Sequence, residues 1–509
     1  MFGFLKDRMN LAVAGIMSVA LAMGWFYRFM QDDAYISFRY ARNLARGLGL
    51  VYNPGERIEG YTNFLWTVCL APCYGLGVDV VTWSEILSVA CFAGALWLTW
   101  RVARRWLGEK AALVALALVA GNYSFCAYAT GGLETMFGIF WILLTVDALA
   151  CDRFLLASLA TVASFMTRMD SSLLLFPFWL TAAFPTGLRM ARVRPIAVGS
   201  AVVLPSVALW LVCRHAYYGA WLPNTFLIKG DVSPVRGLMY VGLFWVLYGY
   251  VVLAGLSFVK GAFRRLPRTA LAAVVLWHGY LILVGGDFME FRLFLPCFPF
   301  LAILAASLAT VAWRCVPVAL VLLGLAGIPR FIPAQLIQTI PDLQDYRDEM
   351  RDFSQELTRI LGPNVRDVWV AITCAGVLPY LTDLPTLDLL GLNDRDVALE
   401  GDPVKPAYAW LGNRPGHCRM ATWPMVVEKR VNLLINFAWT ADRVPEWRTV
   451  ADLNAAWPRF HVEIPSGTEA RVVWWPIAGG RYWPMLYVAD HPAVDEAIRR
   501  SNARVQVLR

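Results

Sequence analysis

The sequence predicts a polytopic α-helical membrane protein that ends in a soluble domain of mixed α and β structure. Of the 509 residues, 58% are hydrophobic and only 16% are charged, whereas soluble domains are about half apolar and about a quarter charged. The apolar residues lie in stretches long enough to cross a hydrocarbon core about 30 Å thick, which takes roughly 20 residues per helix. From about residue 332 onward, Pro, Asp, Arg and Trp become common and no stretch could span a bilayer.

The apolar segments predict about eleven membrane crossings. They run over residues 9–30, 82–101, 110–128, 135–151, 153–167, 171–185, 195–213, 236–259, 268–285, 293–312 and 316–332. The first segment lacks a small-residue cleavage site, so we expect a retained helix and not a cleaved signal peptide. The stretch from Asn63 to Leu76 is short and is broken by Pro72. It is therefore predicted to be a helix in the outer membrane interface.

Basic clusters predict the orientation, because short cytoplasmic loops retain Lys and Arg. They fall at alternate ends of the predicted helices, at residues 6–8, 101–110, 153, 189–194, 260–268 and 314. This pattern places the N-terminus in the cytoplasm and the C-terminal domain on the periplasmic or extracytoplasmic side of a bacterial plasma (inner) membrane. The net charge of +8 is then explained by the basic residues of the cytoplasmic loops. It does not indicate a nucleic-acid partner.

Two domains are expected: residues 1–333 form the transmembrane domain, with a first outer loop at 31–81, and residues 334–509 form the soluble domain. In the latter, 342–361 has helical spacing, and 365–372 and 471–475 have the composition of strands. Cys374 and Cys418 could pair in an oxidising compartment, which sequence alone does not decide. Five residues could contact an acceptor or, for the tryptophans, belong to the core: Asn393, Asp394, Trp410, Trp423 and Trp475.

The first outer loop contains the strongest pattern in the chain. Asp32, Tyr35, Arg39, Arg42 and Arg46 are spaced by three or four residues, so on a helix they share one face. The expected helix lies on the membrane, with carboxylates at its N-terminal end and guanidinium groups behind them. The carboxylates could act on a substrate while the arginines hold a lipid phosphate. The spacing is equally typical of an N-cap followed by arginines that contact lipid headgroups.

Motifs over most of the chain resemble those of C-type (GT-C) glycosyltransferases, and among them the terminal arabinofuranosyltransferases that use decaprenyl-phosphoryl-arabinofuranose. The motifs are DDAYISFRYARN (32–43), NPGE (53–56), EGYTNFLW (59–66), YG (218–219), LPNT (222–225), GGDFM (285–289) and GLND (391–394). The resemblance implies about eleven helices and an extracytoplasmic C-terminal domain. It also implies that the acidic residue after the first helix is catalytic, which designates Asp32, with Asp33 as its neighbour. The tail is the least matched part, so the resemblance supports the reaction class more firmly than the acceptor.

The remaining candidate residues lie in predicted outer loops. The candidates for binding a donor phosphate are Arg39, Arg42, Lys229 and Arg292. The candidates for contacting sugar or acceptor are Tyr35, Asn53, Glu59, Asn63, Asn224 and Asp287. Four others have a structural interpretation that we favour or leave open: an ion pair of Arg168 with Asp170, helix capping by Glu134 and packing by His278.

The predicted reaction moves a pentose, arabinofuranose above all, from a polyprenyl-phosphate donor to a glycan or protein acceptor. Asp32 would be a general base in an inverting transfer, or a nucleophile or ion stabiliser in a retaining one. The resemblance points to retention, because the related enzymes make a β linkage from a β-configured donor. Transfer of another polyprenyl-phosphate-linked sugar, or transport of such lipids, stays as an alternative. The sequence indicates no certain cofactor and leaves a divalent cation open.

Overall fold

The protein is described here from a computed structural model, which divides into two compact units. It describes residues 2–185, 191–229, 233–249, 267–309, 329, 331–334, 336–406, 408, 410–436, 439–457 and 461–509. The helical unit comprises Met1–Met30, Thr62–Gly219 and Ser233–Asp342, and the mixed unit comprises Gln31–Tyr61, Ala220–Val232 and Leu343–Arg509. The division differs from the expected boundary at 333, because residues Gln31–Tyr61 group with the C-terminal residues.

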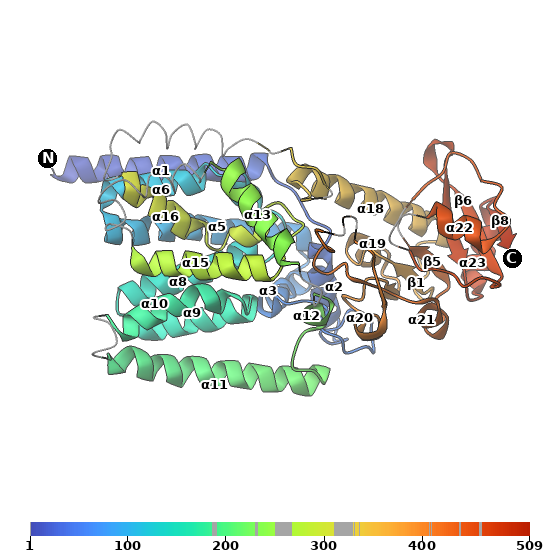
Figure 1. Ribbon diagram of the computed structural model, residues 1–509, viewed down its shortest axis with the longest axis horizontal. Helices are drawn as coiled ribbons and strands as arrows, with labels where there is room; N and C mark the ends of the chain where they lie inside the picture. The colour runs from blue at the N-terminus through green and yellow to red at the C-terminus, as the bar shows by residue number, and fades with distance from the viewer. Residues whose placement is uncertain are drawn as a thin grey trace. The chain divides into compact units, whose positions relative to one another are not determined.

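The helical unit consists of helices connected by short turns, several of which run alongside one another in Figure 1. They are α1 (Phe2–Phe26), α3 (Phe64–Leu70), α4 (Pro72–Leu76), α5 (Val80–Leu107), α6 (Glu109–Ala120), α7 (Tyr123–Ala127), α8 (Thr135–Ala150), α9 (Phe154–Thr167), α10 (Ser171–Ala183), α11 (Val193–Tyr218), α13 (Pro234–Leu247), α15 (Arg268–Leu283), η2 (Arg292–Phe294) and α16 (Phe298–Ala309). The break at Pro72 falls between α3 and α4, as the sequence indicates. The ends of the predicted segments 236–259 and 293–312, and nearly all of 316–332, lie outside the described residues.

Three described helices are long and apolar enough to cross a bilayer: Arg8–Phe26, Val80–Leu107 and Val193–Tyr218. The other apolar helices of this unit are shorter. Helix α11 exposes large apolar side chains, among them Leu204, Leu209 and Val212. Exposed apolar stripes of this kind are costly in water and favourable against lipid hydrocarbon. The helical unit is therefore that of a membrane protein.

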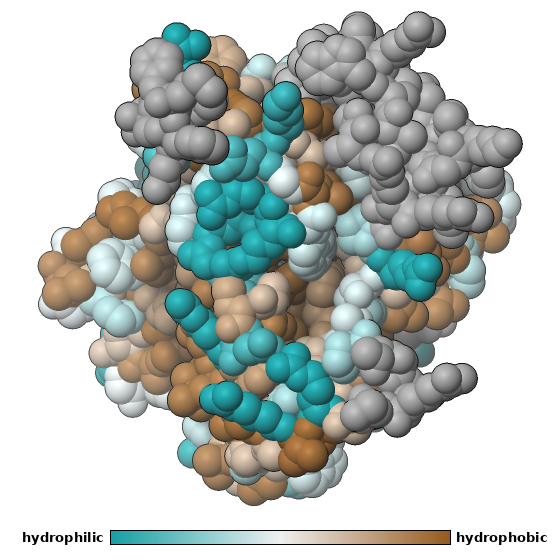
Figure 2. Space-filling model, turned by 90° about the vertical axis from the view of Figure 1, so that its left-hand side faces the viewer, coloured by the Kyte–Doolittle hydropathy of each residue, from teal (hydrophilic) through white to brown (hydrophobic). Residues whose placement is uncertain are grey.

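One end of the helical unit carries hydrophilic residues surrounded by hydrophobic ones. Figure 2 shows this end, where the chain begins in Figure 1. The C-terminal parts of α5 and α8 are joined by ion pairs. Asp147 of α8 binds both Arg101, at 3.0 Å, and Arg105 of α5. The predicted basic cluster at 101–110 is thus partly neutralised by an acidic side chain of a neighbouring helix.

The mixed unit is built around a six-stranded sheet in the order β2-β1-β5-β7-β6-β8. The strands are β1 (Val370–Ile372), β2 (Thr386–Asp388), β5 (Leu433–Asn436), β6 (Ala470–Pro476), β7 (Tyr482–Tyr487) and β8 (Arg504–Leu508), with β3 (Asp402–Pro403) and β4 (Arg419–Met420) forming a separate pair. Strand β1 is parallel to both β2 and β5, whereas β5, β6, β7 and β8 pair antiparallel. The predicted strands at 365–372 and 471–475 correspond to β1 and β6.

Helices connect and cover these strands. They are α2 (Ala34–Ala45), α12 (Asn224–Ile228), α18 (Ile340–Leu361), α19 (Val377–Thr382), α20 (Arg395–Glu400), α21 (Trp423–Glu428), α22 (Val450–Ala456) and α23 (Pro492–Arg500). The apolar stripe of α18 is buried at Leu343, Met350 and Leu357. Helix α2 packs against α19.

The core of the mixed unit explains several residues that the sequence leaves open. Trp475 is fully buried in β6, so it is a core residue and does not contact an acceptor. Trp410 is 64% exposed, whereas Trp423 packs against the core. Cys374 and Cys418 are both buried, and no disulfide joins them. The sequence leaves the pairing of these two cysteines open, and in this structure both thiols are free.

Candidate active site

Asp32 is held by the backbone of the mixed unit. Its side chain lies just before α2 and is only 6% exposed, whereas Asp33 is partly exposed. The amide of Val377 donates to Oδ1 of Asp32 at 2.8 Å, and the amide of Gly376 donates to the same carboxylate. Both amides belong to the turn that leads from β1 into α19. A carboxylate that lies over successive backbone N–H groups is fixed in orientation.

Gly376 is required at this turn by contact and not by its dihedral angles, since its φ is −92°. A Cβ atom built there would lie 2.2 Å from the backbone oxygen of Asp32 and 2.5 Å from its Oδ2. Real Cβ atoms do not approach oxygen atoms so closely. Only glycine allows the turn and the carboxylate to meet at hydrogen-bonding distance.

The surroundings of Asp32 raise its pKa to about 7. Burial is the main cause, the charge of Asp33 adds to it, and the two backbone hydrogen bonds oppose it. Burial also raises the pKa of Asp388, at the end of β2, to about 6. The hydrogen bonds that Asn393 donates to this carboxylate act in the opposite direction and lower its pKa. The Asp32 carboxyl therefore changes protonation near neutral pH, which suits a group that accepts a proton or attacks as an anion.

The sequence pattern predicts that α2 lies on a surface with its arginines turned outward. The structure contradicts this prediction. The residues of α2 from Ala34 to Asn43 are all buried. The Arg39 guanidinium donates to three carbonyl oxygens, those of Tyr52, Pro379 and Leu384, each at 2.8 Å. It also donates to Oδ1 of Asn53 at 3.1 Å. We correct the phosphate-binding interpretation of Arg39 accordingly, because its donors are committed to the protein.

Arg42 is committed in the same way. It donates to the carbonyl oxygen of Tyr380 at 2.7 Å and forms an ion pair with Asp383 at 2.5 Å. Arg46 binds the second oxygen of Asp383 at 2.7 Å. The α2 arginines thus fasten residues 379–384 to α2 and the residues after it, and in this structure Arg39 and Arg42 direct their guanidinium groups at protein oxygens.

Most of the predicted sugar or acceptor contacts also have structural partners. The Asn53 side chain pairs with both backbone groups of Thr386 and donates to Glu56. The Asn224 side chain donates to the carbonyl oxygens of Gly391 and Asp394. The backbone N–H of Asn224 donates to the carbonyl oxygen of Glu59. These contacts join the EGY, LPNT and GLND motifs to one another. Lys229 ends α12 and is exposed.

The helical unit holds a second polar cluster. Arg168 binds Asp170 through two nitrogens, Nε at 3.0 Å and Nη2 at 2.5 Å, and Glu134 through Nη1 at 3.1 Å. Glu134 also accepts from Nδ2 of Asn63 at 2.8 Å, and Asp170 accepts from the hydroxyl of Tyr280 at 2.8 Å. The expected pairing of Arg168 with Asp170 is confirmed, while Glu134 is an ion-pair partner beyond any capping role.

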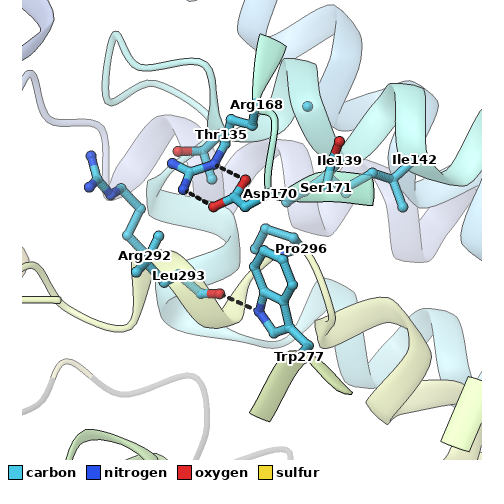
Figure 3. A pocket seen from close by; sticks show the side chains of 11 residues that line it. Thr135, Ile139, Ile142, Arg168, Asp170, Ser171, Trp277, Arg292, Leu293 and Pro296 are labelled. Carbon is cyan, nitrogen blue, oxygen red and sulfur yellow. Dashed lines mark hydrogen bonds and ion pairs between the residues drawn. The ribbon is translucent and has the colours of Figure 1, made fainter. Parts of the chain in front are cut away.

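A narrow pocket adjoins this cluster, and Arg168 and Arg292 both line it (Figure 3). The space in it that a water molecule can occupy is only about 10 Å³. Arg292 is bound to Asp287 at 2.9 Å. With Glu134 and Asp170 beside Arg168, the three carboxylates outnumber the two guanidinium groups, so the pocket as it stands is not a preformed anion site. Nearby, Trp277 donates to the carbonyl of Leu293 at 2.7 Å (Figure 3).

Two further polar residues of the helical unit have partners within the protein. Glu290 is fully buried and accepts from Oγ of Ser124 at 2.8 Å and from the amide of Ile340 at 2.9 Å. His278 accepts from Nε1 of Trp245 at 2.9 Å and contacts the carbonyl of Val274. The packing interpretation of His278 is therefore confirmed. Among the residues that the structure describes, no group of three or more potential ligands could hold a metal ion.

Sequence reasoning missed the residues of α18 and of the β1–α19 turn that surround Asp32. Burial raises the pKa of Tyr346 and of Cys374, and the charge of Asp32 raises both further. The amphipathic pattern of 342–361 predicts the helix but gives no sign that its inner face meets a segment some 300 residues earlier in the chain.

The predicted site residues divide between the two units. The mixed unit contains Asp32, Asp33, Tyr35, Arg39, Arg42, Asn53, Glu59, Asn224 and Lys229, and the helical unit contains Asn63, Asp287 and Arg292. Within the mixed unit, Asp32 and Tyr35 lie together.

Comparison with solved structures relates the fold to a class of membrane transferase. The crystal structure of ArnT from Cupriavidus metallidurans bound to undecaprenyl phosphate matches with a TM-score of 0.50 and 12% sequence identity. The match covers 75% of this chain and 86% of that chain. At this identity the likeness shows a shared fold, that of the GT-C membrane proteins.

Two curated relatives are both called terminal β-(1→2)-arabinofuranosyltransferase. The protein of Corynebacterium glutamicum is 30% identical over 333 residues, covering 55% of this chain and 48% of that protein. The protein of Mycobacterium tuberculosis is 28% identical over 346 residues, covering 56% and 54%. The chain thus spans about half the length of the curated relatives it matches. Residues 338–478 also match a family described as a domain of unknown function (DUF8728).

Proposed function

We propose that this protein is a glycosyltransferase that moves a pentose, arabinofuranose, from a polyprenyl-phosphate donor to a glycan or protein acceptor. Support comes from the names of the two curated relatives, from the GT-C fold and from the motifs of the first outer loop. The observation that carries the proposal is the placement of Asp32. It is a buried carboxylate that is oriented by two backbone amides and titrates close to neutral pH.

In the proposed reaction, the bond between the anomeric carbon and the phosphate oxygen breaks, and its electron pair leaves with the phosphate. The acceptor hydroxyl forms the new bond and gives up its proton. If the transfer inverts, Asp32 takes that proton directly. If it retains, the Asp32 carboxylate first bonds to or stabilises the sugar cation and the proton leaves in the second step. Both routes need Asp32 in its ionised form.

The topology belongs to the same proposal. Eleven crossings with the N-terminus in the cytoplasm would put residues 31–81 and the C-terminal residues on the outer face of a bacterial inner membrane. The alternating basic clusters support this orientation. Asp287 and Arg292, as an ion pair, and Lys229 remain proposed contacts of the donor. A polyprenyl chain would lie in the bilayer, which supplies its hydrocarbon environment.

The test is transfer by the purified protein from synthetic polyprenyl-phosphoryl-arabinofuranose to a short arabinan, with NMR of the new linkage. We expect Asp32→Asn to lower kcat at least about a thousandfold, because an amide neither accepts the proton nor attacks. Asp33→Asn is the matched control, since it removes a neighbouring charge and leaves Asp32 in place. A folded Asp32→Asn protein with full activity would contradict the assignment, and movement of the intact donor across vesicles without any product would favour transport.

A further inference from the structure

A groove lies between α9, α10 and α11 of the helical unit. These three helices pack against one another and lie side by side in Figure 1. The space in the groove that a water molecule can occupy is about 390 Å³, which is within the range of about 300–1,000 Å³ typical of small-molecule sites. Most of the side chains that line it are apolar, and two of them, Phe176 and Leu204, are 61% and 65% exposed. The groove is therefore open along its apolar walls.

The groove is a fixed feature of the packing, because Trp179 of α10 contacts both neighbouring helices. Its Nε1 donates a hydrogen bond to the hydroxyl of Thr161 in α9 at 3.0 Å. On the other side, the indole ring lies against Gly199 of α11, where a Cβ atom would be 3.0 Å from Cζ3 of the ring. A ring held from both sides keeps its place, so the space beside it is formed by the protein alone.

The length of the groove corresponds to one leaflet of a bilayer. The residues of α10 that line it extend from Ser172 to Ala183, a distance of roughly 16 Å along the helix axis at about 1.5 Å per residue. Half of a hydrocarbon core about 30 Å thick has a similar length. An acyl chain that follows the groove would therefore stay within a single leaflet.

Two arginines lie at the end of the groove that Ala183 and Pro195 line. The backbone N–H of Arg192 donates to the carbonyl oxygen of Ala183 at 2.8 Å, which places Arg192 at this end. The guanidinium groups of Arg192 and Arg194 both lie over the ring of Phe154, at 5.5 and 5.9 Å from its centroid. Two cations thus share one aromatic ring where the groove ends.

The positive charge at this end exceeds the negative charge that the protein supplies. Asp152 binds Arg192 at 2.9 Å, and within the described part of the chain it is the carboxylate paired with this cluster. Arg153 is exposed immediately before α9. The N-terminal ends of α9 and α11, which carry partial positive charges, also meet here at Phe154. The end of the groove therefore favours an anion.

We propose that this groove binds an anionic phospholipid, with one acyl chain between α10 and α11 and the headgroup phosphate at Arg192 and Arg194. A phospholipid combines a chain of leaflet length with a phosphate at one end, which matches both parts of the site. A zwitterionic headgroup would bring its own cation to the arginines, so an anionic lipid is preferred. The site belongs to the helical unit alone and goes beyond the transfer reaction proposed above. In the proposed orientation, the lipid belongs to the cytoplasmic leaflet.

The test compares two phospholipids that have the same acyl chains. Delipidated full-length protein in detergent is titrated with palmitoyl-oleoyl phosphatidylglycerol or phosphatidylcholine, and native mass spectrometry gives the affinity for the first lipid bound. We expect phosphatidylglycerol to bind about ten- to thirtyfold more tightly, and Arg192→Gln/Arg194→Gln to reduce this preference to about threefold or less. The matched control is Arg104→Gln/Lys110→Gln, which removes two exposed cations that do not line the groove. The control should keep the preference.

A second variant tests the groove separately from the charges. Ser200→Phe keeps both arginines but places an aromatic ring where Ser200 lines the groove, and we expect the affinity for phosphatidylglycerol to fall about tenfold. Unchanged affinity of this variant would overturn the proposal, because the acyl chain would then lie elsewhere. So would an unchanged preference in Arg192→Gln/Arg194→Gln, or an equal loss in the control, which would assign the preference to surface charge in general. None of these outcomes depends on the transfer reaction.

Discussion

At the scale of single residues, the contact between Gly376 and Asp32 leads to a sharp prediction. Gly376→Ala would place a methyl group on the carboxylate that the turn holds, so either the turn or Asp32 must move. A displacement of about 1 Å at a reacting group can reduce the rate about a hundredfold. We expect that loss in kcat, with the protein still folded. Gly75→Ala is the control, because nothing lies near the position of its Cβ; equal activities of the two variants would argue against a positioning role for Gly376.

The pKa of Asp32 predicts how activity depends on pH. Because burial and Asp33 raise this pKa to about 7, the protonated and inactive form dominates at lower pH. We expect kcat to fall about tenfold for each pH unit below 7 and to level off above it. Asp33→Asn removes one of the causes, so it should move the acidic limb of the profile to lower pH. A profile that does not respond to Asp33→Asn would show that another group controls it.

At the scale of elements, Arg39 fastens α2 to the segment between α19 and β2. Arg39→Met keeps much of the side-chain volume but leaves three buried carbonyl oxygens without their donor. We expect a loss of roughly 3–5 kcal/mol in the stability of the mixed unit, measured as a lower Tm in detergent. Arg57→Met, at an exposed position of the same loop, should leave the Tm nearly unchanged. A similar Tm for both variants would mean that the hydrogen bonds of Arg39 do not stabilise the mixed unit.

The elements also show what sequence can and cannot predict. Hydropathy located most of the helices of the helical unit, because the length and apolarity of a helix are local properties. The motif around Asp32 was found for the same reason. The spacing of Arg39, Arg42 and Arg46 on one face follows from the sequence, but their partners among residues 379–384 lie more than 300 residues away, and no local pattern reveals them.

At the scale of the whole molecule, the mixed unit is assembled from three separate parts of the chain. Residues 343–509 therefore lack α2 when they are expressed alone, and their segment 375–386 loses its hydrogen bonds to Arg39, Tyr52 and Asn53. We expect amide hydrogens of 375–386 to exchange at least about tenfold faster in this fragment than in the full-length protein. Those of β6 and β7, which pair within the fragment, should be protected in both. Equal protection of 375–386 in the fragment and in the full-length protein would mean that the C-terminal part folds this segment without α2.

The discontinuity of the mixed unit has a consequence for how each copy of the protein is made. Asp32 is synthesised early, but Gly376 and Val377, whose amides hold it, follow only after the whole helical unit. The stretch from Tyr61 to Leu343 is about 280 residues long, and at about 5–20 residues per second its synthesis takes on the order of 15–60 s. During that interval the carboxylate has no partner from the C-terminal part. A chain that is truncated before the sheet is complete contains the Asp32 motif but lacks the turn that orients the carboxylate. A new molecule therefore acquires an oriented Asp32 only late in its synthesis.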